Sequence, residues 1–192
     1  MRLLLASQSP RRQELLAKLG YPIEIVKNKV DEHVSPDVPA DRVAEHLARR
    51  KALAGYPVAH LADDEVLVTA DTVVVLDGRV LGKPASHEEA SAMLHSLSGR
   101  SHEVYTGVGL TTRRESCHSF TEKTTVHFRP LEDKEIEYYI DHYRPYDKAG
   151  AYGIQEWIGM VGVSRIEGCY YNVMGLPVAR LYEELKHLMS KS

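Results

Sequence analysis

Hydroxyl and cationic side chains near the start of the chain have the composition of an anion-binding site. The segment reads Ser7-Gln8-Ser9-Pro10-Arg11-Arg12. Ser9 is a favourable N-cap and Pro10 suits the first helical position, so we predict that a helix begins there. Free backbone N–H groups, two guanidinium groups and the serine hydroxyls would together bind a phosphate. Alternatively, the two arginines pair with surface carboxylates such as Glu14.

A further candidate cation, Lys51, lies on a helix predicted over residues 40–54. Helical periodicity places it within the apolar stripe that contains Val43 and Leu47, not opposite that stripe. A lysine in this position either extends its ammonium group outward to solvent or reaches into a cleft and meets an anion. The periodicity alone leaves both interpretations open.

Carboxylates follow two of the predicted strands. Asp71 comes directly after the apolar run over residues 66–70, and Asp31-Glu32 follow the strand predicted over residues 23–26. Ligands of open α/β sheets bind beyond the carboxyl ends of strands. Carboxylates there, beside phosphate-binding cations, are the groups that a magnesium-assisted phosphoryl site requires. The alternative is that each carboxylate only caps a turn or a helix. Thr72 adds a hydroxyl beside Asp71, and the turn Gly82-Lys83-Pro84 displays one more lysine.

The elements that would position these residues alternate between strand and helix. Asp77-Gly78 predicts a hairpin turn, and Ser86-His87-Glu88-Glu89 predicts a capped helix start. Strands are predicted at 2–6, 23–26, 65–70, 72–76, 79–81, 104–110, 124–128 and 159–166, and helices at 10–19, 40–54, 86–97, 132–141 and from Pro177 onward. Because at least one hairpin is antiparallel, we predict an α/β fold with a mixed sheet flanked by helices.

Composition limits the classes of protein. The 192 residues include 24 Lys and Arg against 27 Asp and Glu, a net charge of −3. This balance lacks the basic excess of a duplex-binding surface, so we expect no nucleic-acid partner. No apolar run approaches the roughly 20 residues of a membrane helix, so we expect no membrane partner. Two cysteines, Cys117 and Cys169, exclude a disulfide framework and fit the reducing cytoplasm.

The motifs quoted above resemble the Maf family of nucleoside triphosphate pyrophosphatases over nearly the whole chain and in order. The matching blocks are Leu5-Ala6-Ser7-Gln8-Ser9-Pro10-Arg11-Arg12, Asp31-Glu32, Lys51-Ala52, Ala70-Asp71-Thr72, Gly82-Lys83-Pro84, Leu97-Ser98-Gly99, Tyr105-Thr106-Gly107, the run from Asp147 to Gln155, Ile166-Glu167-Gly168 and Val173-Met174-Gly175-Leu176-Pro177.

The resemblance implies a particular fold and activity. The fold would be an elongated mixed sheet flanked by helices with a central cleft, similar to that of inosine triphosphate pyrophosphatases. Residues 1–192 would form one Maf-like domain with two lobes around the cleft. The enzyme would be a cytoplasmic homodimer that hydrolyses the α–β phosphoanhydride of nucleoside triphosphates with Mg²⁺ or Mn²⁺, releasing the monophosphate and pyrophosphate.

The resemblance also implies roles for single residues. Asp71 matches the proton acceptor, and Glu32 and Asp71 form the metal side. Substrate and phosphate binding would fall to Ser7, Arg12, Lys51 and Lys83, and substrate specificity to Arg11, Thr72 and Gln155.

The three specificity positions match the branch that acts on dTTP and UTP, including modified pyrimidine nucleotides. The branch acting on 7-methyl-GTP has Trp, Gln and Glu in place of Arg11, Thr72 and Gln155. A neutral Gln amide both donates and accepts, which suits the adjacent carbonyl and N–H of a pyrimidine. The alternatives are a pyrophosphatase for 7-methyl-GTP or another non-standard nucleotide, and a nucleotide-sensing regulator of septum formation and cell division.

Overall fold

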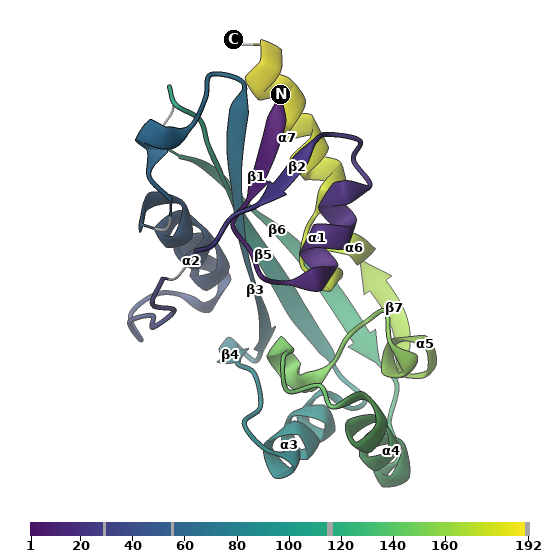
Figure 1. The fold of residues 1–192 in the computed structure, drawn as a ribbon. Coiled ribbons are helices and arrows are strands. Elements are labelled where there is room, and N and C mark those ends of the chain that lie inside the picture. Colours follow the sequence, from purple (N-terminus) through teal and green to yellow (C-terminus); the bar gives the residue numbers. More distant parts are fainter. Residues whose placement is uncertain (29, 55, 115–116, 191–192) are drawn as a thin grey trace. The chain divides into compact units, whose positions relative to one another are not determined.

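The protein has an α/β fold in which helices and strands alternate along the chain (Figure 1). The computed structural model describes residues 1–28, 30–54, 56–114 and 117–190. The strands are β1 (Arg2–Leu5), β2 (Ile23–Ile25), β3 (Glu65–Leu76), β4 (Arg79–Leu81), β5 (Ser101–Thr111), β6 (His118–Phe128) and β7 (Val163–Glu167). The helices are α1 (Pro10–Ala17), α2 (Ala40–Ala54), α3 (His87–Leu97), α4 (Asp133–Tyr143), α5 (Trp157–Gly162), α6 (Tyr170–Met174) and α7 (Val178–Ser190), with 3₁₀ turns η1 (Val58–His60) and η2 (Ala149–Ala151).

Among the described residues the strands form one seven-stranded sheet with the order β2-β1-β3-β5-β6-β7, and β4 pairs with β3. β1 runs parallel to both β2 and β3, with Leu3 opposite Ile23 on one side and Val66 on the other. The β3–β4 and β6–β7 pairs are antiparallel. The sheet is therefore mixed and flanked by helices, which confirms the predicted fold class.

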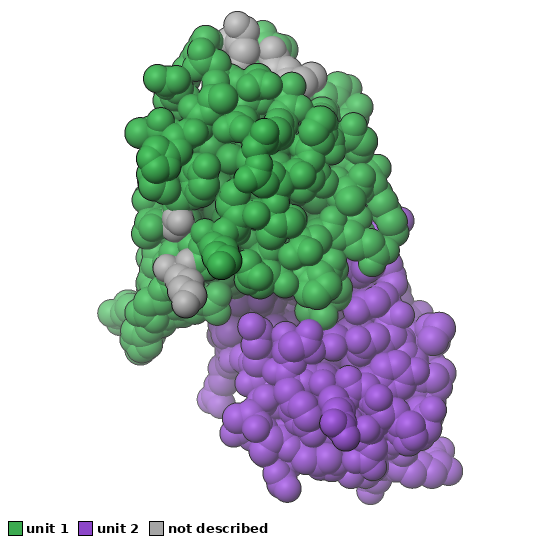
Figure 2. All heavy atoms as spheres, in the orientation of Figure 1, with its two compact units in different colours: residues 1–71, 106–122, 175–192 green, residues 72–105, 123–174 purple. Residues whose placement is uncertain are grey.

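The chain divides into two compact units (Figure 2). Unit 1 consists of residues 1–71, 106–122 and 175–192, and unit 2 of residues 72–105 and 123–174. The long strands β3, β5 and β6 contribute residues to both units.

In unit 1, helix α2 lies directly on strand β5. A Cβ atom added at Gly107 would lie 2.4 Å from the backbone carbonyl of Ala44, so only glycine permits this approach. The hydroxyl of Thr69 on β3 donates to the Ala48 carbonyl at 2.8 Å, which fixes the same helix to the next strand. Figure 1 shows α1 and α7 on the other side of these strands. Covered on both faces, β1 buries Leu3, Leu4 and Leu5 almost completely.

The Gly107→Ala substitution is expected to destabilise the protein by about 3 kcal/mol, because the new methyl group meets backbone that cannot rotate away. The free energy of unfolding, measured by urea denaturation, tests this. Gly82→Ala is the matched control, since a Cβ atom there meets nothing within 4 Å. Equal losses in the two variants would contradict the close packing of α2 on β5.

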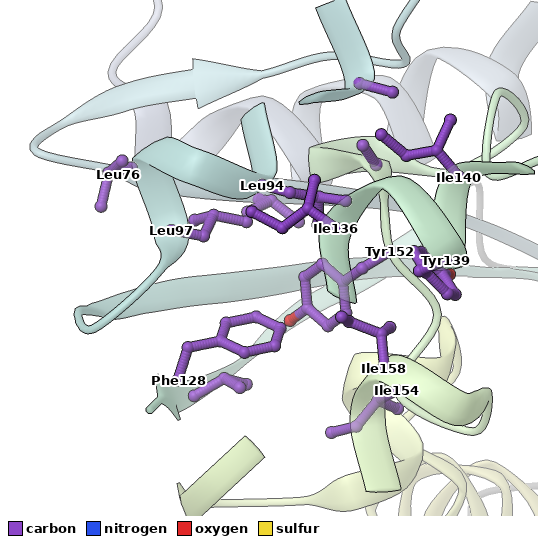
Figure 3. Close-up of a cluster of buried hydrophobic side chains, with 14 of the residues drawn as sticks. Leu76, Leu94, Leu97, Phe128, Ile136, Tyr139, Ile140, Tyr152, Ile154 and Ile158 are labelled. Carbon is purple, nitrogen blue, oxygen red and sulfur yellow. The ribbon is translucent and has the colours of Figure 1, made fainter. Parts of the chain in front are cut away.

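The core of unit 2 is formed by α3, α4 and α5 against the strands (Figure 3). Helix α4 buries Ile136, Tyr139 and Ile140 completely. Phe128 of β6 and Tyr152, after η2, meet edge to face with 5.1 Å between ring centroids. Tyr139 and Tyr152 thereby fix the loop between α4 and α5 to the core.

A buried histidine completes this core. His102 on β5 is 2% exposed, stacks on Phe128 and places Nε2 2.7 Å from the Tyr152 hydroxyl. Burial lowers the pKa of His102 to about 4, with a smaller contribution from the charge of His127.

Stability is expected to fall as the pH drops from 6.5 to about 4, because unfolded His102 binds a proton in this range and folded His102 does not. The loss approaches about 3 kcal/mol for a shift of this size. Urea denaturation of wild type and His102→Gln across this range measures it, and the variant should show a shallower slope. Parallel curves for the two proteins would contradict the prediction.

Several predicted element boundaries are wrong. Residues 65–76 form a single strand, so Asp71 lies within β3 and does not follow its end. The side chain of Asp71 is satisfied by an ion pair, so the strand continues through it. Residues predicted as a strand over 159–166 begin instead with α5, where Gly159 packs against the Ile154 carbonyl too closely for any Cβ atom. The prediction also missed α6, η1 and η2.

Candidate active site

The carboxylate of Asp71 forms an ion pair with Lys51. The ammonium nitrogen of Lys51 lies 2.7 Å from Oδ1 of Asp71, and each side chain is only 13% exposed. Lys51 is in the last turn of α2, the helix that the glycines of β5 hold against the sheet. Lys51 therefore reaches inward and meets an anion, and the anion is a carboxylate of the protein itself.

Glu32 meets the same ammonium group. Its Oε1 lies 2.7 Å from Nζ of Lys51, with the glutamate side chain 55% exposed. Arg50, the neighbour of Lys51 on α2, holds the surrounding segment by donating to the carbonyls of Asp31 and His33 at 2.7 and 2.6 Å. Two carboxylates thus converge on one position from segments far apart in the sequence.

Asp31 does not join this pair. Its Oδ1 accepts a hydrogen bond from the backbone N–H of His33 at 3.0 Å, so its carboxylate caps its own turn. The expectation that the Asp31-Glu32 pair brings further carboxylates toward Asp71 therefore holds for Glu32.

The side chain of Arg12 contacts the backbone of Ala70, the residue directly before Asp71. Its Nη1 donates to the carbonyl of Ala70 at 2.9 Å, and its Nε donates to the carbonyl of Gly175 at 2.8 Å. Nη1 also lies 3.4 Å from the hydroxyl of Ser7. Burial lowers the pKa of the Arg12 guanidinium, while the charges of Asp71 and Glu32 oppose that shift.

Helix α1 begins where the sequence predicts. The Ser9 side chain is the N-cap and accepts from the Arg12 N–H, and Pro10 occupies the first helical position. Glu14 forms its ion pair with Lys18, at 2.6 Å. Arg12 instead turns toward backbone carbonyls, where its charge lies close to Asp71.

Five of the predicted site residues come together within unit 1: Ser7, Arg12, Glu32, Lys51 and Asp71. Arg11 is half-buried in the first turn of α1. The remaining three belong to unit 2: Thr72 is half-buried on β3, Lys83 is exposed between β4 and α3, and Gln155 is half-buried before α5. Their roles stay predictions from the resemblance.

Three residues that support the site were not predicted for that role: Asn28, Arg50 and Gly175. Asn28 donates through Nδ2 to the carbonyl of Lys51 at 2.9 Å, at the C-terminal end of α2. Gly175 has a φ of +115°, a conformation that favours glycine, and its carbonyl accepts from Arg12. The sequence signal for Gly175 is its place directly before Leu176-Pro177 at the start of α7. No local pattern identifies Asn28.

The donor set fits a hard divalent cation completed by substrate. In the part of the chain that the structure describes, no group of three or more His, Cys, Asp or Glu side chains is arranged to hold a metal ion. Mg²⁺, however, is usually bound through one or two carboxylates together with substrate phosphates. Glu32 and Asp71, which converge on one cationic group, supply two such carboxylates.

An α/β fold with cations and carboxylates clustered at one strand is typical of enzymes that act on phosphate groups. The family model described as Maf-like protein matches residues 2–188, and the chain belongs to that family.

Two relatives show how close the similarity is. A Porphyromonas gingivalis protein named dTTP/UTP pyrophosphatase is 50% identical over 189 residues, covering 96% of this chain and 93% of its own. A Carboxydothermus hydrogenoformans protein of the same name is 53% identical over 189 residues, covering 97% and 98%. A solved structure of the Staphylococcus aureus Ham1 protein aligns over 67% of this chain and 72% of its own, with 14% identity and a TM-score of 0.47.

No described helix has the length and apolar character needed to cross a bilayer.

Proposed function

We propose that this protein is a hydrolase that cleaves dTTP and UTP between the α and β phosphates, releasing the monophosphate and pyrophosphate. The observation that carries the proposal is about 50% identity, over nearly the full length of both chains, to relatives named dTTP/UTP pyrophosphatase. The geometry adds support, because Arg12 and Lys51 lie beside the carboxylates of Asp71 and Glu32.

Arg12 and Lys51 would bind the triphosphate and stabilise the charge that develops on the leaving pyrophosphate. The guanidinium of Arg12 is held by two carbonyls, so its orientation is set before substrate arrives. A positioned cation of this kind needs little reorganisation during the reaction. Ser7, whose hydroxyl lies beside Arg12, would add a donor for a phosphate oxygen, and Lys83 is proposed to bind phosphate as well.

Asp71 is proposed to accept the proton of the attacking water. Its carboxylate is mostly buried and its orientation is set by the ion pair with Lys51, and a general base must be positioned in this way. Glu32 and Asp71 would hold Mg²⁺ or Mn²⁺. When bound, the cation would neutralise phosphate charge and orient the substrate.

Arg11, Thr72 and Gln155 are proposed to select the pyrimidine base. The proposal further includes one Maf-like domain over residues 1–192, a homodimer and a cytoplasmic location, all of which follow from the resemblance.

A pyrophosphate-release assay tests the proposal. The protein is incubated with Mg²⁺ or Mn²⁺ and with dTTP, UTP or 7-methyl-GTP, each over a range of concentrations below and above its KM, and kcat/KM is compared. We expect dTTP and UTP to be cleaved with kcat/KM at least about tenfold above 7-methyl-GTP. Preference for 7-methyl-GTP would instead identify the other branch, and no pyrophosphate from any nucleotide would favour a nucleotide-sensing regulator.

A further inference from the structure

Gln155 is presented by a tight turn that is anchored in the core of unit 2. The backbone N–H of Glu156 donates to the carbonyl of Gly153 at 3.0 Å, so Ile154 and Gln155 are the central residues of a four-residue turn. Ile154 is 4% exposed and packs in the core (Figure 3), whereas Gln155 is half-buried. The turn therefore fixes the backbone of Gln155 but leaves open which end of its amide faces a ligand.

The carboxylate of Glu156 is held from two directions. The Tyr139 hydroxyl of α4 donates to its Oε2, and the ammonium group of Lys148 lies 3.1 Å from its Oε1. Tyr139 also accepts from the Gly153 N–H at 3.0 Å, which joins the turn to the same hydroxyl. Burial and the neighbouring Glu156 raise the pKa of Tyr139, so the phenol stays protonated and donates.

Lys148 supplies the countercharge for this carboxylate. Its side chain is 8% exposed, and its Nζ also lies 2.7 Å from Oδ1 of Asp147. Since a buried lysine needs a paired anion, Lys148 and Glu156 stabilise one another in place. The negative charge of Glu156 is thereby fixed at the base of the turn.

This fixed charge lies beside the Gln155 amide. A Cβ atom built on Gly153 would lie 3.0 Å from Oε2 of Glu156 and 3.0 Å from Nε2 of Gln155, so both groups border the same small space. A carboxylate attracts the NH₂ end of an amide and repels its carbonyl oxygen. In the structure Nε2 lies on the Gly153 side, where Oε2 of Glu156 also lies, and the charge of Glu156 favours this orientation, which leaves Oε1 at the other end as an acceptor.

We propose that Glu156, fixed by Tyr139 and Lys148, is a positioning residue that orients the Gln155 amide so that Oε1 accepts from the N3–H of uracil or thymine. This inference rests on the proposed function. Cytosine has an acceptor at N3, so an amide locked in this orientation disfavours cytosine. This arrangement also depends on glycine at position 153, because a side chain there would meet both Glu156 and Gln155.

The Glu156→Gln variant tests the inference, because it removes the charge and keeps the size. We expect kcat/KM for UTP to fall about tenfold, mainly through KM, the equivalent of one lost hydrogen bond. The ratio of kcat/KM for UTP over CTP should fall by at least the same factor. The kcat for UTP should change little, because the phosphate-binding side chains are untouched.

Tyr139→Phe is the second variant, since it removes one donor to Glu156 and keeps the ring in the core. It should shift the UTP/CTP ratio in the same direction by a few-fold. Tyr143→Phe, one turn along α4 and stacked on Tyr139, is the matched control and should leave the ratio unchanged. Circular dichroism and urea denaturation confirm that each variant is folded.

The outcomes separate this inference from the function on which it rests. Wild-type protein that releases no pyrophosphate from UTP or dTTP would contradict the proposed function. Active wild type, with folded Glu156 and Tyr139 variants that keep the wild-type UTP/CTP ratio, would overturn the positioning role alone. A loss of stability without any change in the ratio would likewise show that the network is structural only.

Discussion

Replacing Asp71 by asparagine is expected to lower kcat for dTTP and UTP by about 10³-fold, within the range contributed by a positioned general base. Asparagine keeps the shape of the side chain but cannot accept a proton from water or match a carboxylate as a cation ligand. The fold should persist, because Lys51 retains its ion pair with Glu32. Steady-state pyrophosphate release and circular dichroism measure the two effects.

Asp63→Asn provides the matched control for this experiment. Asp63 lies just before β3, whereas Asp71 lies within that strand, and the side chain of Asp63 is 69% exposed. Its substitution should leave kcat within a factor of about two, because surface changes away from the site have small effects. Turnover of Asp71→Asn equal to that of wild type would exclude Asp71 as the base.

The elements that were predicted correctly are those set by local chemistry. The Asp77-Gly78 turn appears with both residues at positive φ, as a two-residue hairpin requires. Ser86 caps α3 by accepting from the Glu89 N–H, and Pro10 begins α1 behind the cap of Ser9. Each of these signals depends on residues within four positions of one another, so it can be recognised from the sequence alone.

The errors arise where a distant partner decides the local structure. A charged residue in an apolar run suggests the end of a strand, but Asp71 is paired with Lys51, twenty positions earlier, and β3 continues. Likewise α5 forms because residue 159 is a glycine that permits contact with the Ile154 carbonyl. Neither contact produces a periodic pattern in the local sequence.

The site residues divide in the same way, into those that local sequence indicates and those that depend on contacts between distant segments. The arginines and serines of α1 indicate anion binding from their own spacing, because a helix start with added cations has a direct chemical meaning. That Lys51 joins Asp71 to Glu32 depends on how α2 lies on β3 and β5, which the periodicity of α2 left open. The support that Glu156 receives from Tyr139 and Lys148 is equally non-local, since α4 and the loop before α5 meet only in the folded chain.

Replacing Lys51 by methionine is expected to affect stability and activity together. Methionine is close to lysine in length but leaves the buried carboxylate of Asp71 without its ammonium partner. Breaking a buried ion pair on one side costs about 3–5 kcal/mol, and the 13% exposure of Asp71 places this variant near the lower value. We expect kcat/KM for UTP to fall by about 10²-fold or more, because a cation is lost beside the phosphate-binding groups. Urea denaturation and pyrophosphate release measure the two losses.

A double-variant cycle separates the two roles of Lys51. Adding Asp71→Asn to Lys51→Met removes the unpaired buried charge, so stability should recover by about 2 kcal/mol while activity stays lost. Lys18→Met is the matched control, because Lys18 pairs with Glu14 on the exposed face of α1 and should cost under about 1 kcal/mol. If the double variant is no more stable than Lys51→Met, the Lys51–Asp71 pair does not carry the stabilising charge interaction. A recovery of stability while activity stays lost would separate the charge interaction from a general change in folding, which would alter both together.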